Sequence, residues 1–140
     1  MADDEDLPVL VVDGAAFSDL EGFAREISKL IPYGGTWNGN LNDFDGLLRG
    51  KWGPFPEGGW VFRWVNSDLS RTALGYEATA VWREGLRRRC HPSHREGLEA
   101  DIAAARRGEG ETLFDMIVEM IRAHGAGGEE WEDNVVLELV

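Results

Sequence analysis

The chain carries the apolar stretch Pro8-Val9-Leu10-Val11-Val12-Asp13-Gly14. A continuous apolar run that ends at Asp-Gly is typical of a β-strand covered on both faces. The next segment, Ser18-Asp19-Leu20-Glu21, has the pattern of a capping box at the start of a helix. A stripe at helical spacing follows until Pro32 interrupts it, and it consists of Leu20, Phe23, Ile27, Leu30 and Ile31. A strand followed by an amphipathic helix predicts the first half of a crossover connection in a parallel sheet.

Further along the chain, similar patterns predict two more strands and several helices. Apolar runs at residues 60–65 and 135–140 are interpreted as strands, and an amphipathic helix is predicted to start at Thr112. Residues 68–109 contain two weaker helical patterns, from Tyr76 to about Arg88 and from Arg95 to about Arg107. Together these elements predict one α/β domain over residues 1–140, with a small three-stranded parallel sheet flanked by helices.

Composition restricts the kinds of partner. The 140-residue chain has a formal net charge of −12, which disfavours nucleic acid and favours a cationic partner. The sequence shows neither a secretory signal pattern nor a run long enough to span a membrane. Its single cysteine, Cys90, cannot form an internal disulfide. We therefore expect a cytoplasmic protein that does not bind membranes and is monomeric when free.

The segment from Thr36 to Gly50 combines turn-forming residues with a short acidic helix. Asn40 or Asn42 can cap this helix, and Asp43 and Asp45 then fall in its first turn, where the helix dipole favours negative charge. The apolar residues recur at helical spacing and form the buried face: Leu41, Phe44, Leu47 and Leu48. The acids must then point away from the core, which predicts a surface suited to a cation.

The order of elements, the Asn40-Leu41 start and the Leu47-Leu48 turn of this helix together resemble the barstar family, the intracellular inhibitors of secreted bacterial guanyl ribonucleases. The resemblance covers Val9 to about Val65 and resumes from about Gly110 to Val140, so residues 68–109 correspond to an extra helical insertion. It implies a protein that binds a ribonuclease one to one and blocks its active site. Carboxylates of the acidic helix and the loop before it would stand in for the substrate phosphates.

The residues of this sequence match the family pattern only in part. In ungapped register, the principal inhibitory aspartate of the family falls at Gly46 and the second helix aspartate at Asn42. Asp45 and Asp43 each lie one position away, and the acid from the last helix falls beside Glu119. Trp37 retains an aromatic residue ahead of the helix, where we expect it at the exposed rim together with Trp52. The predicted partner-binding residues are Trp37, Asn42, Asp43, Asp45, Gly46 and Glu119.

Two alternatives remain from the sequence. One is an immunity protein of the same fold whose target is a different toxin, which the glycine at position 46 suggests. The other is a small metal-binding module or enzyme centred on Cys90, His91 and His94, although no second cysteine is present to complete a typical zinc site. Asp43 and Asp45 point about 200° apart on a helix, so they do not form an acid–base pair. We therefore predict no catalytic residues, metal or cofactor.

Overall fold

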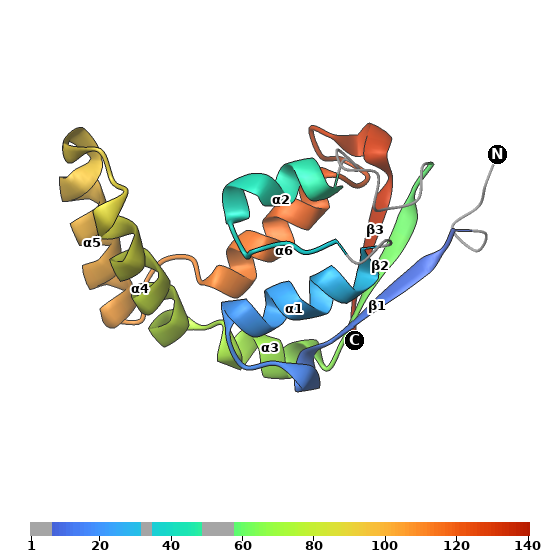
Figure 1. Cartoon of the computed structure of the whole chain (residues 1–140), viewed down its shortest axis with the longest axis horizontal. Helices are drawn as coiled ribbons and strands as arrows, with labels where there is room; N and C mark the ends of the chain where they lie inside the picture. Colours follow the sequence, from blue (N-terminus) through green and yellow to red (C-terminus); the bar gives the residue numbers. More distant parts are fainter. Residues whose placement is uncertain (1–6, 32–34, 49–57) are drawn as a thin grey trace.

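A computed structural model describes residues 7–31, 35–48 and 58–140. Three parallel strands form one sheet in the order β1-β2-β3: β1 (Val9–Asp13), β2 (Trp60–Val65) and β3 (Val135–Leu139). The α-helices are α1 (Leu20–Leu30), α2 (Leu41–Leu48), α3 (Ser67–Ala73), α4 (Tyr76–Gly85), α5 (Arg95–Arg106) and α6 (Leu113–Ala123) (Figure 1). Short 3-10 turns lie at η2 (Gly14–Ala16), η4 (Leu86–Arg88), η5 (Pro92–His94) and η6 (Trp131–Asp133). The predicted α/β class and three-stranded parallel sheet are confirmed.

β2 is the central strand and pairs with both others along its length. Val61 lies opposite Val9 of β1 on one side and opposite Val136 of β3 on the other, so these three valines form one row across the sheet. Strand β2 occupies the residues predicted for it, and β1 and β3 differ from their predicted bounds by a single residue at one or both ends. Both connections between neighbouring strands are crossovers that contain helices, as a parallel sheet requires.

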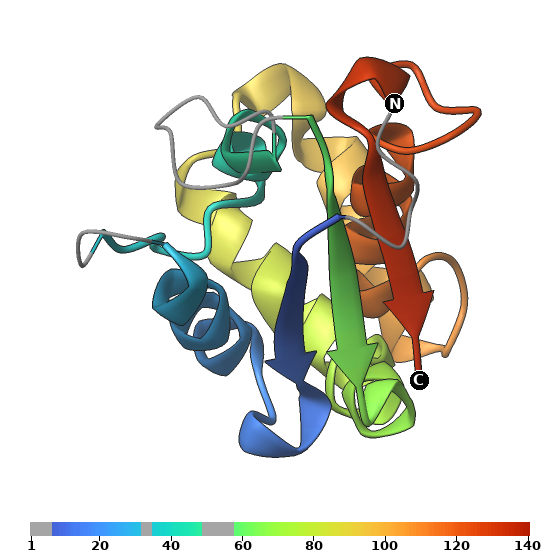
Figure 2. The ribbon, with the colours of Figure 1, turned by 90° about the vertical axis from the view of Figure 1, so that its right-hand side faces the viewer.

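The helices that form the core lie on one face of the sheet, and the strands form the opposite surface of the molecule (Figure 2). Val9 and Val11 are exposed on that surface, where Arg63 of β2 also pairs with Glu138 of β3 at 2.7 Å. The prediction that β1 is covered on both faces is therefore wrong. β1 is a short strand at the edge of the sheet. Valine favours the extended conformation of a strand, so a run of valines can occur there even when one face of the strand is exposed.

Helix starts follow local hydrogen-bond chemistry, with one departure from the sequence prediction. Asp19, and not Ser18, caps α1, and its Oδ1 accepts a hydrogen bond from the backbone N–H of Gly22 at 2.7 Å. The predicted box at Ser18 is thus displaced by one residue, because the carboxylate supplies the stronger acceptor. At α6, Thr112 and Asp115 form a reciprocal capping box.

The core between the sheet and the helices is rich in aromatic rings. Phe23 of α1 stacks on Trp64 of β2 with ring centroids 5.2 Å apart, and Phe114 of α6 lies 5.1 Å from Trp64 on centroids. The indole N–H of Trp64 donates to Oγ of Ser70 at 2.9 Å, so the buried polar atom is satisfied. These contacts fix α1, α3 and α6 against the central strand.

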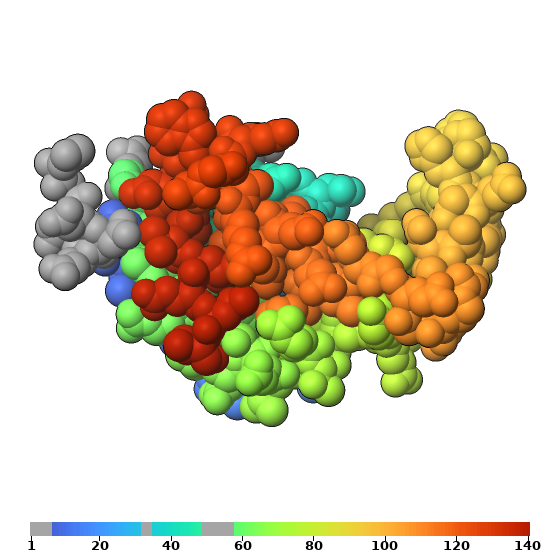
Figure 3. Space-filling view, turned by 180° about the vertical axis from the view of Figure 1, so that it is seen from behind, coloured from blue at the N-terminus to red at the C-terminus, as the bar shows by residue number. Residues whose placement is uncertain are grey.

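α4 and α5 form a helical hairpin that projects from this body (Figures 1 and 3). Both predicted helices are confirmed to within a few residues, since α4 continues through η4 to Arg88. Arg87 donates two hydrogen bonds to Glu99, at 2.7 and 2.8 Å, and Arg106 pairs with Glu84, which ties the two helices together. Helix α3, also within residues 68–109 for most of its length, packs on the body.

Candidate partner-binding site

Asn40 organises the start of α2. Its Oδ1 accepts from the backbone N–H of Asn42 at 3.0 Å, and its carbonyl oxygen accepts from the N–H of Asp43 at 3.0 Å. Oδ1 of Asn38 in turn accepts from the N–H of Asn40 at 2.9 Å. A chain of short polar side chains therefore sets the direction in which the helix enters, and Asn42 is not needed as a cap.

Trp37 does not lie at the rim of this surface. Its side chain is 4% exposed, it stacks on Phe44 with centroids 5.0 Å apart, and its indole N–H donates to the carbonyl oxygen of Asn40 at 3.0 Å. The prediction that Trp37 is an exposed anchor is wrong, because the loop folds the ring under α2, where one hydrogen bond satisfies its polar atom. Trp52, predicted at the same rim, lies outside the described residues.

The phase of α2 follows from its buried face, which consists of the four predicted residues Leu41, Phe44, Leu47 and Leu48. Asn42 and Gly46, four positions apart, share the outward stripe. Asp43 and Asp45 lie on the two flanks of that stripe and are both partly buried. Within the described part of the chain, the Asp43 side chain has no hydrogen-bond or ion-pair partner. The two acids are thus displayed on opposite sides of a ridge that carries no charge.

Asp45 is held from inside the protein by a histidine. Its Oδ1 lies 3.0 Å from Nε2 of His124, while Nδ1 of the same ring lies 2.7 Å from Oδ2 of Asp133. The His124 side chain is 0% exposed, whereas that of Asp45 is 48% exposed. The ring therefore joins α2, the end of α6 and η6 in one polar network, which we call the Asp45–His124–Asp133 clamp.

The hydrogen-bonding capacity of the ring defines the chemistry of this clamp. A neutral imidazole has one N–H donor, whereas an ionised carboxylate can only accept, so a neutral ring satisfies one of the two acids. The imidazolium donates from both nitrogens and satisfies both carboxylates with charge-assisted hydrogen bonds. The two contacts thus place one buried ring between two carboxylates, while the Asp45 side chain remains 48% exposed.

Local backbone geometry places His124 in this position. The carbonyl oxygen of His124 accepts from the N–H of Val135 at 2.9 Å, which joins the end of α6 to the start of β3. A side chain on the next residue, Gly125, would collide with the carbonyl oxygen of Val135, so this close approach requires glycine. Sequence reasoning did not select His124 as a site residue. A histidine-glycine pair at a helix end, nine residues before an aspartate, is too common a pattern to indicate a buried ion pair.

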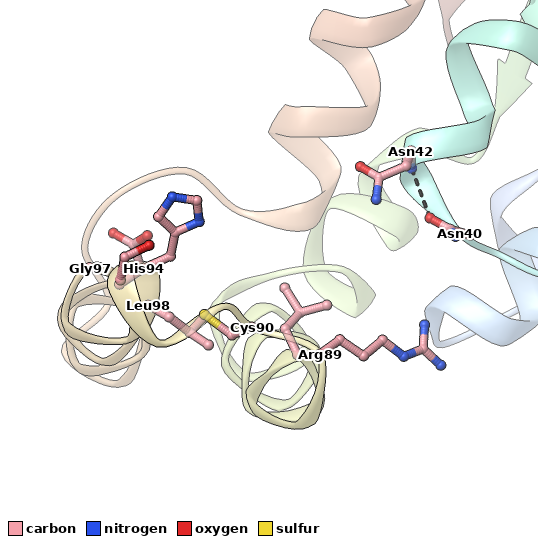
Figure 4. Close-up of a pocket in the computed structure, with 10 residues that line it drawn as sticks. Asn40, Asn42, Arg89, Cys90, His94, Gly97 and Leu98 are labelled. Carbon is pink, nitrogen blue, oxygen red and sulfur yellow. Dashed lines mark hydrogen bonds between the residues drawn. The ribbon is translucent and has the colours of Figure 1, made fainter.

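A cleft separates the start of α2 from the projecting hairpin. It encloses about 660 Å³ and is lined by Asn40 and Asn42 on one wall and by Leu86, Arg89 and Leu98 among others on the opposite wall (Figure 4). Asn42 points into the cleft, and Arg89 extends from the hairpin toward the α1 side of it. The predicted insertion therefore forms part of the surface that surrounds the acidic helix.

Glu119 lies elsewhere. It lines a separate pocket on α6, together with Glu111, Asp115, Arg71 and Arg122 among others. On α6, Glu119 and His124 are five residues apart, so they point about 140° from one another, and it is His124 that meets α2. The structure brings Asn42, Asp43, Asp45 and Gly46 together on one helix but does not add Glu119 to that surface.

The acidic pair formed by Glu111, just before α6, and Glu119, on α6, should make the free energy of unfolding depend on pH. The negative charge of Glu119 raises the pKa of Glu111, and desolvation and a hydrogen bond with Glu119 act in the same direction. The folded chain thus binds this proton more tightly than the unfolded chain, and stability falls as pH rises from the ordinary glutamate range through the raised pKa. We expect Glu111→Gln to raise the thermal midpoint slightly at neutral pH and to leave it unchanged in acid. Thermal melts at both pH values check this.

A matched control for that experiment is Glu129→Gln, which removes the same charge from an exposed residue on a different loop. An equal rise in both variants would mean that total net charge, and not the Glu111–Glu119 pair, destabilises the folded chain.

The residues around Cys90 do not assemble into the metal module considered from the sequence. Nδ1 of His91 accepts from the backbone N–H of Ser93 at 3.1 Å and lies 2.7 Å from its Oγ, and the rings of His91 and His94 are 6.1 Å apart on centroids. In the described ranges, no group of three or more His, Cys, Asp or Glu residues is placed to hold a metal ion. The motif acts locally, by starting η5.

Comparison with known proteins identifies no relative: no family model, no curated protein and no solved structure matches this chain. None of the helices in the described ranges is both long and apolar enough to cross a lipid bilayer. The chain is an α/β protein in which a buried histidine contacts an aspartate of the acidic helix α2.

Proposed function

We propose that this chain is a protein inhibitor of the barstar type, which binds a secreted bacterial guanyl-type ribonuclease one to one in the cytoplasm of the producing cell. It is not an enzyme in this proposal, and it needs no cofactor or metal. The observation that supports it most strongly is Asp45, a half-exposed carboxylate on α2 with one oxygen held by a buried histidine. A fixed acid of this kind suits a guanidinium or ammonium group that normally binds phosphate.

Two other features of α2 support the same proposal. The carboxylate of Asp43, on the other flank of the helix, has no partner within the described residues, so it breaks no contact with them when a cation binds it. The formal net charge of −12 also produces a negative field that accelerates association with a cationic enzyme. Inhibition then follows from occupying the phosphate-binding groups of the nuclease and covering its active site.

The proposal is tested by titrating the purified chain into RNA hydrolysis by several secreted bacterial guanyl ribonucleases, with a pancreatic-type ribonuclease as the specificity control. Stoichiometric inhibition of at least one guanyl enzyme, without inhibition of the control, is expected. Unchanged hydrolysis by every guanyl enzyme, at chain concentrations well above those of the enzymes, would contradict the ribonuclease proposal.

A second candidate function is an immunity protein that neutralises a different toxin. The outward stripe of α2 carries Asn42 and Gly46, at the two positions where the resemblance places the inhibitory acids, and the phase of the helix leaves both residues facing outward. The hairpin also adds a wall beside this stripe. Both features suit a target surface of different shape. Binding measurements against a panel of purified bacterial toxins distinguish this candidate from the first.

The cleft allows a prediction about the hairpin. Half of the 14 Lys and Arg residues of the chain lie between residues 76 and 109, and Arg89 is the one that lines the cleft facing Asn40 and Asn42. Because a partner that binds the acidic helix is cationic there, Arg89 opposes its approach. We expect Arg89→Glu to tighten binding by about 0.5–1 kcal/mol. Titration calorimetry with the inhibited enzyme measures the change.

Arg88→Glu is the matched control for Arg89→Glu, because it makes the same charge change on an adjacent exposed residue that does not line the cleft. We expect a smaller gain from it. Weaker binding of Arg89→Glu alone would show instead that the partner inserts an acidic group into the cleft.

A further inference from the structure

His124 is a buried titratable group whose contacts end at the acidic helix. We propose that His124 is a positioning residue of the binding surface: it holds one oxygen of Asp45 from within the protein so that the other oxygen is presented to a cation of the partner. The consequence for binding rests on the proposed function, whereas the clamp itself does not depend on any partner.

The geometry of the clamp fixes the orientation of the Asp45 carboxylate. An aspartate on the surface of a helix normally samples several rotamers, and binding must then pay for ordering it. Here the carboxylate is anchored at 3.0 Å by Nε2 of a ring that is itself anchored at 2.7 Å by Asp133. Because the ring is fully buried, it has no room to turn, and its orientation fixes that of Asp45. A supporting residue that fixes a contacting residue is a recognised requirement of precise binding sites.

The charges of the clamp also favour its role in binding a cation. Two carboxylates that approach the same ring repel one another unless a positive charge lies between them. One imidazolium between Asp45 and Asp133 removes that repulsion and still leaves the three groups with a net negative charge. Asp45 therefore remains attractive to an external cation. Asp43, two residues earlier on α2, offers a second carboxylate to the partner from the other flank of the helix.

The contacts of the His124 ring exclude a reactive role for it. Both nitrogens of His124 are occupied by carboxylates, and the side chain has no exposed surface from which to exchange a proton with a substrate. Burial without any free nitrogen suits a structural group that supports Asp45 and does not suit a general base.

The clamp is tested directly by nuclear magnetic resonance of the imidazole nitrogens in the full ¹⁵N-labelled chain at neutral pH. We expect both ring nitrogens to be protonated and protected from exchange. Asp45→Asn should shift the Nε2 signal and leave Nδ1 nearly unchanged, and Asp133→Asn should do the reverse. Asp43→Asn, the matched control on the same helix, should shift neither. A neutral ring that carries its proton on Nδ1, or an Nε2 signal that ignores Asp45→Asn, would overturn the proposal.

The positioning role is tested by a double-mutant cycle on inhibition of a guanyl ribonuclease. We expect His124→Gln to weaken inhibition about tenfold in the unmodified chain and to have no further effect when Asp45 is already Ala. Equal losses in both backgrounds would show a merely structural effect and would overturn the positioning role. His124→Asn serves as a second variant if His124→Gln does not fold, with folding confirmed by circular dichroism.

Failure of the proposed function is distinguishable from failure of this inference. If no guanyl ribonuclease is inhibited, the same cycle is measured on the thermal midpoint, where His124 and Asp45 should be coupled and His124 and Asp43 should not. Coupling of the first pair alone supports the clamp, and its absence contradicts it.

Discussion

Replacing Trp37 by Ala is expected to lower the free energy of unfolding by about 3–5 kcal/mol, the cost of removing a buried aromatic side chain. Trp37 stacks on Phe44 and closes the loop that leads into α2, and its indole N–H satisfies the carbonyl oxygen of Asn40. The substitution leaves a cavity beneath the acidic helix and removes one of the two hydrogen bonds that the carbonyl oxygen of Asn40 accepts, since the N–H of Asp43 still donates to it. Chemical denaturation, followed by the fluorescence of the remaining tryptophans, measures the loss.

Trp131→Ala is the matched control for Trp37→Ala. Trp131 lies in η6 and is 60% exposed, so its removal should change stability by no more than about 0.5 kcal/mol. If Trp37→Ala were as mild as Trp131→Ala, the burial of Trp37 beneath α2 would be contradicted, and the original expectation of an exposed anchor would be restored.

Replacing both Asp43 and Asp45 by Ala should weaken binding to the target by at least about 2 kcal/mol, because a close charge pair across an interface couples by about 1.5–7 kcal/mol. The loss should appear mainly as faster dissociation, since the long-range charge of the chain changes little. Surface plasmon resonance with immobilised nuclease separates the two rates. His124 keeps Asp133 as a partner in this variant, so the fold should persist.

The control for this pair is Glu77→Gln together with Glu96→Gln, which removes two acids from the exposed surface of the hairpin. We expect that control to slow association slightly and to leave dissociation unchanged. A folded Asp43/Asp45 variant that inhibits as well as the unmodified chain would refute the assignment of α2 as the binding helix.

The sheet and most helices could be predicted from the sequence because their signals are local. An apolar run such as residues 60–65 and a stripe such as that of α6 report directly on what each segment must bury. The exposed valines of β1 could not be predicted, since a continuous apolar run does not reveal whether a strand lies at the edge of a sheet. The short helix α3 lacks a long enough pattern to have been found.

Of the candidate site, only the buried and exposed faces of α2 could be predicted from the sequence. Its buried residues were identified correctly, and the phase of the helix follows from them. His124 and Asp133 could not be identified, because their meeting with Asp45 joins residues that are 79 positions apart and depends on how α6 packs beside α2. Trp37 was misplaced for a related reason: an aromatic residue in a loop can fold inward or outward, and the choice depends on the cavity beneath the loop.

The pairing of the strands affects the order of events during folding. Arg63 and Glu138, which face each other across β2 and β3, are 75 residues apart, so the sheet closes through contacts of high sequence separation. Such topologies fold more slowly than those built from neighbouring segments. The same closure brings Asp133 of η6 to the His124 ring that holds Asp45. The acidic surface should therefore mature late, and partly folded chains should be unable to capture a target.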